Sequence, residues 1–233
     1  MVNYHFGRGR ARLIPYLLLL PGILFYLVIM LGPSVATSVY SFTDATGLKG
    51  AEVHWVGFDN YTNLFKDPEF LISAYNTFYF AVLSIPLAII TAFGLALLLN
   101  MNIRGRFIYR TVYFLPTLVP SVALSLIWIQ LFNPATGVVN LPFDWIGVRG
   151  PCWNACATWS RPTMVLLALW IIGGQVVLYL AGLQDVPQEL YDAAMVDGAN
   201  VFQKFRAVTL PMMTPVIFFH LITSVIGAFQ FFD

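Results

Sequence analysis

The sequence has 233 residues, of which 59% are hydrophobic and only 10% are charged, and its mean hydropathy is +0.77. A soluble domain carries about 25% charged residues, so this composition predicts an integral membrane protein and excludes a soluble domain with one anchor. The formal net charge of +1 indicates no basic surface, and we expect no nucleic-acid partner.

The first apolar stretch follows Arg8, Arg10 and Arg12 and stays uncharged from residue 13 to residue 43. The apolar region of a secretory signal is only about 7–15 residues long. We therefore expect this stretch to be retained as the first membrane helix.

Five segments reach the length of mostly apolar sequence, about 20 residues, that a membrane span requires. They are residues 13–40, 74–100, 111–132, 163–183 and 212–232. Inside lipid the backbone polar groups must bond to one another, which favours helices. The sequence therefore predicts an all-α fold, a polytopic membrane helix bundle that forms one transmembrane domain over residues 1–233.

The distribution of lysine and arginine predicts the orientation, because cytoplasmic segments of membrane proteins carry the excess. With the N-terminus inside, eight of these residues lie in inner segments: Arg8, Arg10, Arg12, Arg104, Arg106, Arg110, Lys204 and Arg206. Four lie in outer segments: Lys49, Lys66, Arg149 and Arg161. We therefore expect a multi-pass protein of the cytoplasmic (inner) membrane, embedded in lipid, whose N-terminus and loop 184–211 are cytoplasmic.

The two long outer segments are rich in aromatic residues, which either seat at the headgroup level of a membrane or dock an outside partner. In residues 52–70 the expected anchors are Trp55, Phe58, Tyr61, Leu64 and Phe65. The only cysteines, Cys152 and Cys156, lie in the other segment, residues 133–162. An oxidising compartment permits a disulfide, but C-x-x-x-C spacing on a regular helix is poor for one, so a disulfide and free structural thiols both remain open.

The chain contains no G-x-x-x-x-G-K-[ST], H-E-x-x-H or G-x-S-x-G motif. We therefore expect a non-catalytic subunit that does not hydrolyse ATP by itself, without a cofactor of its own. The two cysteines have no histidine nearby in the sequence, and we expect no metal site. His220 is a lone histidine in a predicted span, where a packed, hydrogen-bonded role is favoured over a ligand or proton carrier.

The polar loop 184–211 separates the last two predicted spans and has the character of ordered structure. Asp185 can cap a helix there, and Pro187 suits the first turn of that helix. Glu189 and Asp192 then place negative charge near its positive end. This pattern predicts a short helix that starts near Pro187.

The second half of the loop predicts a break and a further helix. Ala193 and Ala194 are small, so another surface can approach the backbone closely there. Gly198 is expected to end the first helix, because glycine tolerates conformations that other residues resist. A second short helix is expected from about residue 200 to residue 208, and Pro211 is expected to end the unit and start the next span.

The spacing in this loop resembles the EAA motif of ABC importer permeases: Glu-Ala-Ala, three residues, Gly, nine residues, Ile, one residue and Leu-Pro. The matching residues are Asp192, Ala193, Ala194, Gly198, Val208, Leu210 and Pro211. Asp192 stands where the motif has Glu, and Val208 where it has Ile. The resemblance implies that the loop couples to a separate ATPase. The coupling residues expected from it are Glu189, Asp192, Ala193, Ala194, Asp197, Gly198, Leu210 and Pro211.

Other segments resemble the carbohydrate-uptake branch of that family, in particular the maltose-type F-like permease of a heterodimeric pair. They are Trp55 to Tyr61, Asn76-Thr77, Arg110-Thr111 and Leu115-Pro116. The resemblance implies a type I importer fold, a second permease subunit, cytoplasmic ATP-binding subunits, an extracytoplasmic solute-binding protein and a sugar substrate. Such permeases continue beyond Asp233 into a sixth core helix, so we expect a truncated sequence that is inactive alone.

Polar and small residues inside the last two spans are candidates for the solute path. One face of the fourth span is expected to hold, at helical spacing, Leu167, Trp170, Ile171 and Gly174. We expect Trp170 to stack on a sugar ring, and Gln175 and Ser224 to form hydrogen bonds with its hydroxyls. Helix–helix packing is the alternative role for each of these residues.

Three other functions compete with sugar import on the basis of the sequence. A glycerol-3-phosphate-type ABC permease would favour a cationic or helix-end site for the phosphate, whereas the spans contain no lysine or arginine. A secondary transporter would need ionisable relays inside the membrane, and the spans lack acidic residues as well. A membrane enzyme ranks last, because no acid, base and nucleophile cluster at a shared depth.

Overall fold

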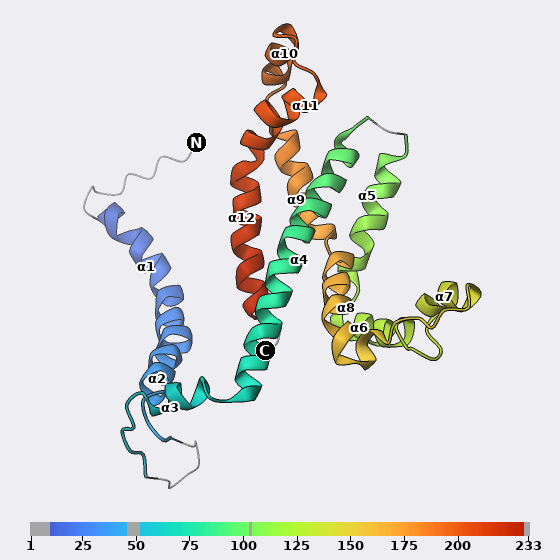
Figure 1. Ribbon diagram of the computed structural model, residues 1–233. Coiled ribbons are helices and arrows are strands. Elements are labelled where there is room, and N and C mark those ends of the chain that lie inside the picture. Colours follow the sequence, from blue (N-terminus) through green and yellow to red (C-terminus); the bar gives the residue numbers. More distant parts are fainter. Residues whose placement is uncertain (1–9, 46–51, 103, 231–233) are drawn as a thin grey trace. The chain divides into compact units, whose positions relative to one another are not determined.

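Figure 1 shows a computed structural model of the chain, which describes residues 10–45, 52–102 and 104–230. The chain forms two compact units, Met1–Ile72 and Ser73–Asp233. Some of the expectations above fall outside the described residues. These are Arg8 and Lys49 of the charge count, the end of the last span at residue 232, and the truncation at Asp233.

The first unit contains a long apolar helix in three segments: α1 (Arg10–Phe25), the π-helical η1 (Tyr26–Leu31) and α2 (Gly32–Tyr40). Over Pro15–Tyr40 the helix is long and apolar enough to cross a membrane. The hydroxyl groups of its serines and threonines donate to backbone carbonyls four residues earlier. Polar groups that bond to their own helix in this way need no water, which suits a span.

An aromatic cluster follows this helix within the first unit. Phe42 stacks on Trp55, with ring centroids 5.6 Å apart, and meets Phe58 edge-on at 5.3 Å. Tyr61, in α3 (Asp59–Leu64), lies 5.5 Å from the same ring. Three of the aromatic anchors expected in residues 52–70 therefore gather around one ring at the end of α2.

The core of the second unit lies where three helices meet. α4 (Pro68–Asn100), which starts in the first unit, packs there against α9 (Gly173–Gln184) and α12 (Leu210–Phe229) (Figure 1). Ala92 and Ala96 are fully buried at this contact, and small residues of this kind let membrane helices approach closely. The other buried members are Phe93, Leu99, Ile172, Val176, Tyr179, Leu180, Leu183 and Met213.

The third predicted span is broken into α5 (Arg106–Phe114), a 3-10 turn and α6 (Ser121–Leu131). The span is bent by 99° between its two halves. Val119 is extended, with ψ of 127°, directly before Pro120. Proline disfavours helical backbone in the residue before it and donates no backbone hydrogen bond, which accounts for the break. Pro86, by contrast, lies inside the unbroken α4.

The fourth predicted span is also bent, by 46° between α8 (Ala157–Trp170) and α9. Gly173 lies so close to α5 that a β-carbon there would meet the carbonyl oxygen of Tyr113. Glycine permits this approach because it has no side chain. The predicted single face through Trp170 and Gly174 is therefore wrong, because the helix ends at Trp170 and restarts at Gly173.

By length and composition, three of the described helices can cross a membrane, and up to five spans result if each bent pair counts as one. The described residues form no strand beyond one isolated bridge between Thr43 and Trp55. The predicted all-α membrane helix bundle is confirmed, and the two broken spans are a feature that hydropathy did not reveal.

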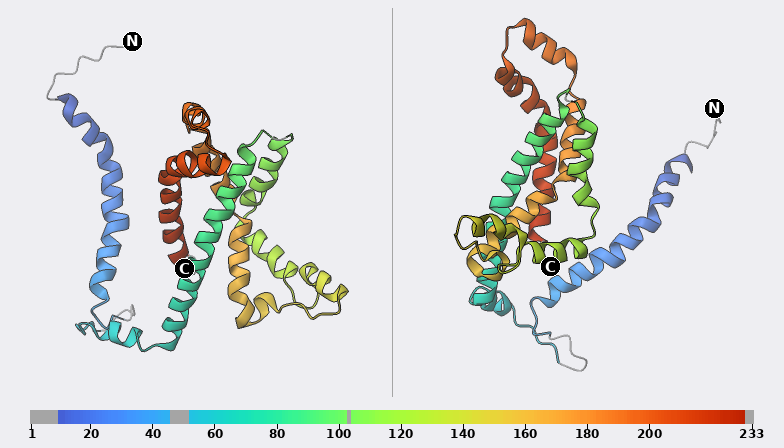
Figure 2. Two further views of the ribbon diagram at one scale, coloured as in Figure 1. Left: turned by 45° about the horizontal axis from the view of Figure 1, so that its top comes forward. Right: turned by 90° about the vertical axis from the view of Figure 1, so that its right-hand side faces the viewer.

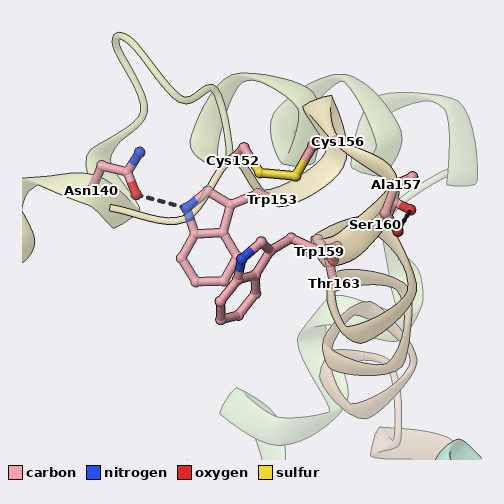
Figure 3. The surroundings of a disulfide bond; sticks show 8 residues. All are labelled: Asn140, Cys152, Trp153, Cys156, Ala157, Trp159, Ser160 and Thr163. Carbon is pink, nitrogen blue, oxygen red and sulfur yellow. Dashed lines mark hydrogen bonds between the residues drawn. A yellow bond between two sulfur atoms is a disulfide. The ribbon is translucent and has the colours of Figure 1, made fainter. Parts of the chain in front are cut away.

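The segment between α6 and α8 folds into η3 (Val138–Asn140), α7 (Leu141–Trp145) and η4 (Trp153–Ala155). The amide oxygen of Asn140 accepts a hydrogen bond of 2.7 Å from the indole nitrogen of Trp153 (Figure 3). Both side chains are buried. This bond therefore ties η3 to η4 across the loop that contains α7.

Cys152 and Cys156 form a disulfide that encloses η4 (Figure 3). Trp153 has a positive φ of 43°, and Cys156 is extended, so the residues between the cysteines are not a regular helix. Their α-carbons lie 5.7 Å apart, a separation that a disulfide readily bridges. The C-x-x-x-C spacing is unfavourable only on a regular helix, and of the two alternatives left open the structure has the disulfide.

Candidate functional site

The polar loop between α9 and α12 folds into two short helices, α10 (Gln188–Val196) and α11 (Val201–Lys204). The π-helical η5 (Phe205–Thr209) connects α11 to α12. Figure 2 shows this orange-to-red loop at the opposite end of the second unit from the start of α8. The loop therefore protrudes from the helix core at one end.

The start of α10 differs from the expected one. Asp185 is the C-cap of α9, where its backbone N–H bonds to the carbonyl of Ala181 at 3.2 Å, and it does not cap α10. Pro187 is the N-cap of α10, without a side-chain hydrogen bond. The side-chain amide of Gln188 donates to the carboxylate of Asp192 at 3.3 Å. The expectation of an Asp185 cap is thus wrong, because α9 extends far enough to use that residue itself.

Gly198 ends α10 through a Schellman motif. The N–H of Ala199 bonds to the carbonyl of Ala194 at 2.9 Å, and the N–H of Gly198 bonds to the carbonyl of Met195 at 3.0 Å. Gly198 has φ of +75°, a left-handed conformation that glycine adopts without strain. A β-carbon at this position would meet nothing within 4 Å. The need for glycine is therefore conformational, and it explains why the helix stops here.

α11 starts with a capping box that the sequence analysis missed. The N–H of Gln203 bonds to the side chain of Asn200 at 2.9 Å, and the N–H of Asn200 bonds to the side chain of Gln203 at 2.8 Å. The Asn-x-x-Gln spacing was the available signal. From Val201 the helix runs unbroken to Phe229. Pro211 lies in the first turn of α12, as expected for the start of the span. The expected end of the loop unit before it is wrong, because α11 continues through the wider turns of η5 into α12.

The coupling residues expected from the motif are mostly on the surface. Ala194 is half-buried. The other seven are exposed, namely Glu189, Asp192, Ala193, Asp197, Gly198, Leu210 and Pro211. The one ion pair within the described residues joins His54 and Glu52, so none of the four carboxylates of the loop lies within ion-pair distance of a described cation. The first half of the loop, through α10 and Asp197, is therefore acidic, and the two cations of the loop, Lys204 and Arg206, lie in its second half.

Four exposed apolar side chains flank the turn at Gly198, and we call them the apolar tip. They are Met195, Val196, Val201 and Phe202. Val196 is 88% exposed and Val201 is 80% exposed. Sequence reasoning missed this feature, although apolar residues in a polar loop were a visible signal. Clustered exposed apolar residues mark sites of interaction with another protein or a membrane.

The loop is attached to the helix core at two points. The hydroxyl of Tyr191 in α10 lies 3.0 Å from the buried hydroxyl of Thr209, at the end of η5. The ring of Phe205 lies 6.1 Å from the ring of Phe93 in α4. These contacts connect the position of α10 with the positions of α12 and α4.

A second group of predicted residues lines an open hollow of about 370 Å³ between α9 and α12. This α9–α12 hollow contains Gly174, Gln175 and Ser224, three of the four residues expected along the solute path. Thr223 and His220 also line it. The structure thus brings an amide, two hydroxyls and an imidazole to one surface.

Trp170, the fourth of these residues, lies elsewhere. It precedes the break between α8 and α9 and is not part of the lining of the α9–α12 hollow. Its ring meets Trp128 of α6 edge-on, with centroids 5.7 Å apart. Trp170 is 56% exposed, so one part of its surface is free of contacts within the described chain.

His220 is only 3% exposed and bonds through Nδ1 to the hydroxyl of Tyr179 at 2.6 Å. The expected packed, hydrogen-bonded role is confirmed. Its Nε2 and the side-chain oxygen of Gln175 are buried without a hydrogen-bond partner among the described residues. Buried polar atoms of this kind are costly unless something bonds them. Both atoms belong to residues that line the α9–α12 hollow.

The comparisons with known proteins agree with these features. Residues 84–233 match the family of binding-protein-dependent transport system inner membrane components. The chain is 36% identical over 225 residues to the arabinooligosaccharides transport system permease protein AraP of Halalkalibacterium halodurans, covering 95% of this chain and 70% of the relative. It is 31% identical over 224 residues to the sn-glycerol-3-phosphate transport system permease protein UgpA of Pectobacterium atrosepticum, covering 94% and 74%.

A similar chain occurs in the crystal structure of a bacterial alginate ABC transporter in complex with an alginate pentasaccharide-bound periplasmic protein. The TM-score is 0.76 and the identity is 26%, over 89% of this chain and 69% of that chain.

A polytopic helix bundle with a protruding two-helix loop, together with these similarities, defines a membrane transport protein. The chain belongs to the family of binding-protein-dependent transport system inner membrane components, the permeases of ABC importers. The predicted resemblance is thereby confirmed. This membership sets aside the secondary transporter as an alternative.

Proposed function

We propose that the chain moves a sugar or oligosaccharide across the cytoplasmic membrane as the non-catalytic permease of an ATP-driven importer. Loop 184–211 and the N-terminus face the cytoplasm, and the loop couples the chain to a separate ATPase. The observation that carries the proposal is the Schellman turn at Gly198. It holds the exposed carboxylates of α10 and the apolar tip together on one protruding unit.

The partners follow from the family and from its relatives. An importer of this class needs a second permease subunit, two ATP-binding subunits and an extracytoplasmic solute-binding protein. The alginate transporter was crystallised with its periplasmic protein, which supports such a partner for this chain. The exposed carboxylates in the first half of the loop suit a cationic partner surface on the ATPase, because complementary charge guides association.

Docking of the ATPase would move α9 and α12, because the loop is continuous with both. The Tyr191–Thr209 bond joins α10 to η5, and η5 continues into α12. A displacement of α10 therefore reaches the two helices that line the α9–α12 hollow. The displacement favours one transport state only if the ATPase contacts differ between the two states.

The α9–α12 hollow is the part of the solute path that this chain supplies. The amide of Gln175 and the hydroxyls of Ser224 and Thr223 can exchange hydrogen bonds with sugar hydroxyls. Trp170 offers a stacking surface on the other side of the bend between α8 and α9. Gly174 has no side chain and so adds no bulk to the wall of the hollow. The uncharged amide and hydroxyl groups favour a neutral sugar over the phosphate ester that the name of UgpA specifies.

Coupling can be tested with the chain co-expressed with its second permease, its ATPase and its binding protein. Asp192→Lys should lower recovery of the ATPase with the membrane complex on the order of tenfold, because it places a cation against a cationic surface. Asp144→Lys, in the exposed α7, is the matched control and should leave recovery unchanged. Equal recovery for both variants would contradict the proposal.

The orientation is tested with Ala194→Cys in the same complex. A membrane-impermeant maleimide should label this cysteine only in inverted vesicles, where the cytoplasmic face is accessible. Labelling in intact cells would place the loop on the outer face and contradict a coupling role.

The substrate class is tested separately with the reconstituted complex. Neutral oligosaccharides presented by the binding protein should stimulate ATP hydrolysis, and Gln175→Ala together with Ser224→Ala should reduce uptake while ATPase recovery stays normal. Stimulation by glycerol 3-phosphate alone would instead assign the other branch of the family.

A further inference from the structure

Trp153 has an unusual backbone conformation for a large side chain, and the disulfide loop holds it there. It is the only residue other than glycine with a positive φ, of 43°, in the described part of the chain. Such conformations persist only where the surrounding structure fixes them. Here the bond between Cys152 and Cys156 closes the backbone around η4, and the buried indole N–H bonds to Asn140 (Figure 3). The loop therefore presents the Trp153 ring in one defined orientation.

The Trp153 ring is the first of four aromatic rings in contact, which we call the aromatic row: Trp153, Phe132, Trp128 and Trp170. Trp153 meets Phe132 edge-on, with ring centroids 5.0 Å apart. Phe132 stacks on Trp128 at 4.8 Å, and Trp128 meets Trp170 edge-on at 5.7 Å. All three separations lie in the range of favourable aromatic contacts. The aromatic row thus runs from the disulfide loop to the last residue of α8.

The end of α6 depends on the aromatic row for its position. None of the residues within α6 is buried. Phe132, the C-cap of this helix, is buried where it contacts Trp128 and Trp153. Trp153 is buried as well. Loss of the Trp153 contact would therefore free the one buried side chain that fixes the end of α6.

The start of α8, by contrast, is attached to the core independently of the disulfide. Nε of Arg161 donates a hydrogen bond of 2.7 Å to the side-chain oxygen of Asn76 in α4. Val165 is buried in a cluster with residues of α4. The backbone of α8 is therefore held on α4, whereas Trp128 moves with α6. A change in the disulfide loop should reach Trp170 as a change in the orientation of Trp128 against it.

We infer that the disulfide and Trp153 position Trp170 through the aromatic row. Trp153 and the cysteines are thus positioning residues, at the opposite end of the row from the residue they orient. This inference concerns the orientation of the Trp170 ring and goes beyond the proposed function. Only its consequence for transport rests on the proposed contact between Trp170 and a sugar.

Reduction of the disulfide is the most direct way to remove this constraint. Cys152 and Cys156 are half-buried, so part of each is accessible to a small dithiol. The dithiol is oxidised to its own disulfide, the S–S bond of the protein breaks, and the two protons of the dithiol pass to the two cysteine thiols. Trp153 can then leave the left-handed region, and the aromatic row loses its fixed end.

The test follows Trp170 in the assembled importer complex in detergent by near-ultraviolet circular dichroism. Subtraction of the spectrum of Trp170→Phe from that of the parent isolates this residue from the other tryptophans of the complex. Dithiothreitol should cause loss of most of this difference band, because such bands require fixed packing around the ring. An unchanged band in the reduced complex would overturn the inference. Since the parent is reduced after assembly, this result does not depend on folding of a loop variant.

Variants of the loop separate positioning through the aromatic row from general loosening of the outer segment. Each is measured with and without Trp170→Phe. Cys152→Ser combined with Cys156→Ser should lack the difference band before dithiothreitol is added. Trp153→Ala should lack it although the disulfide is intact. Trp159→Ala is the matched control, because the Trp159 ring meets Trp153 at 5.8 Å but lies outside the row, and it should keep the band. Loss of the band in Trp159→Ala as well would overturn a specific route through the aromatic row.

Uptake in proteoliposomes distinguishes this inference from the proposed function. Reduction should lower uptake by the parent about fivefold, the value of one aromatic contact. Trp170→Ala should show this loss before reduction and no further loss after it. A further loss in Trp170→Ala, absent from the variant with both cysteines replaced by serine, would show that the disulfide acts by another route and would overturn the inference. Normal uptake by Trp170→Ala, with the difference band still lost on reduction, would support the positioning and contradict only the sugar contact.

Discussion

The hydroxyl groups of Tyr191 and Thr209 lie 3.0 Å apart although the residues are 18 positions apart in the chain. Tyr191 belongs to the exposed helix α10, and Thr209 is buried where η5 meets α12. The bond therefore joins the surface on which we propose that an ATPase docks to a helix of the core.

Removal of this bond should weaken coupling. Tyr191→Phe deletes one hydroxyl and leaves that of Thr209 buried, at a cost of about 1 kcal/mol, or roughly fivefold in an equilibrium between two loop positions. The ratio of solute transported to ATP hydrolysed should fall in proteoliposomes that contain the complete importer. Tyr109→Phe is the control, because Tyr109 is exposed and its hydroxyl bonds to no described residue. A parental ratio for Tyr191→Phe would show that the bond does not transmit motion.

Substitution of Gly198 should disturb the turn without a steric clash. Valine at φ of +75° costs about 1–2 kcal/mol or more, because β-branched residues resist the left-handed region. Gly198→Val should uncouple ATP hydrolysis from uptake, whereas Gly198→Asn should be tolerated. Gly94→Val is the matched control, since Gly94 also has open space around its α-carbon but a helical backbone. Coupled uptake at the parental rate in Gly198→Val would count against this role for the turn.

The pair formed by Tyr179 and His220 should show strong energetic coupling. Tyr179→Phe leaves Nδ1 of the buried His220 without its partner, which should lower the free energy of unfolding by about 1–3 kcal/mol. Replacement of both residues by phenylalanine should cost less than the sum of the single changes. Thermal unfolding of all four combinations in detergent gives the coupling energy, and additive losses would show that the bond contributes nothing of its own.

The buried bond between Asn140 and Trp153 should stabilise the outer segment. Asn140→Ala removes the acceptor of a buried indole N–H and should lower the free energy of unfolding by about 1–3 kcal/mol. Asn154→Ala is the control, because Asn154 is exposed in the same segment. Intrinsic tryptophan fluorescence during heating measures both variants, and equal midpoints would exclude a stabilising role.

Several features of this chain were predictable because they depend on nearby residues. Hydropathy located the apolar segments, and the spacing from Asp192 to Pro211 located the loop. Gly198 was assigned as a helix end from its residue type, and the structure shows the Schellman motif that such a glycine permits. Asn200 and Gln203 had the same local character, and their capping box could have been read from the spacing.

Other features depend on residues that are distant in the sequence. The bends after Leu118 and at Gly173 have proline and glycine signals, but their angles result from packing of each half on neighbouring helices. Trp170 and Gly174 would share one face only on a continuous helix, and the helix is broken between them.

The sequence alone thus determined that this chain is an all-α membrane permease with a structured polar loop, because apolar length and motif spacing are properties of neighbouring residues. Only the tertiary structure decided that Tyr191 bonds to Thr209, that Gln175 and His220 share one hollow, and that Arg161 is held by Asn76. Each of these contacts joins separate helices, and the relative placement of helices results from packing of the whole core, which no local pattern contains.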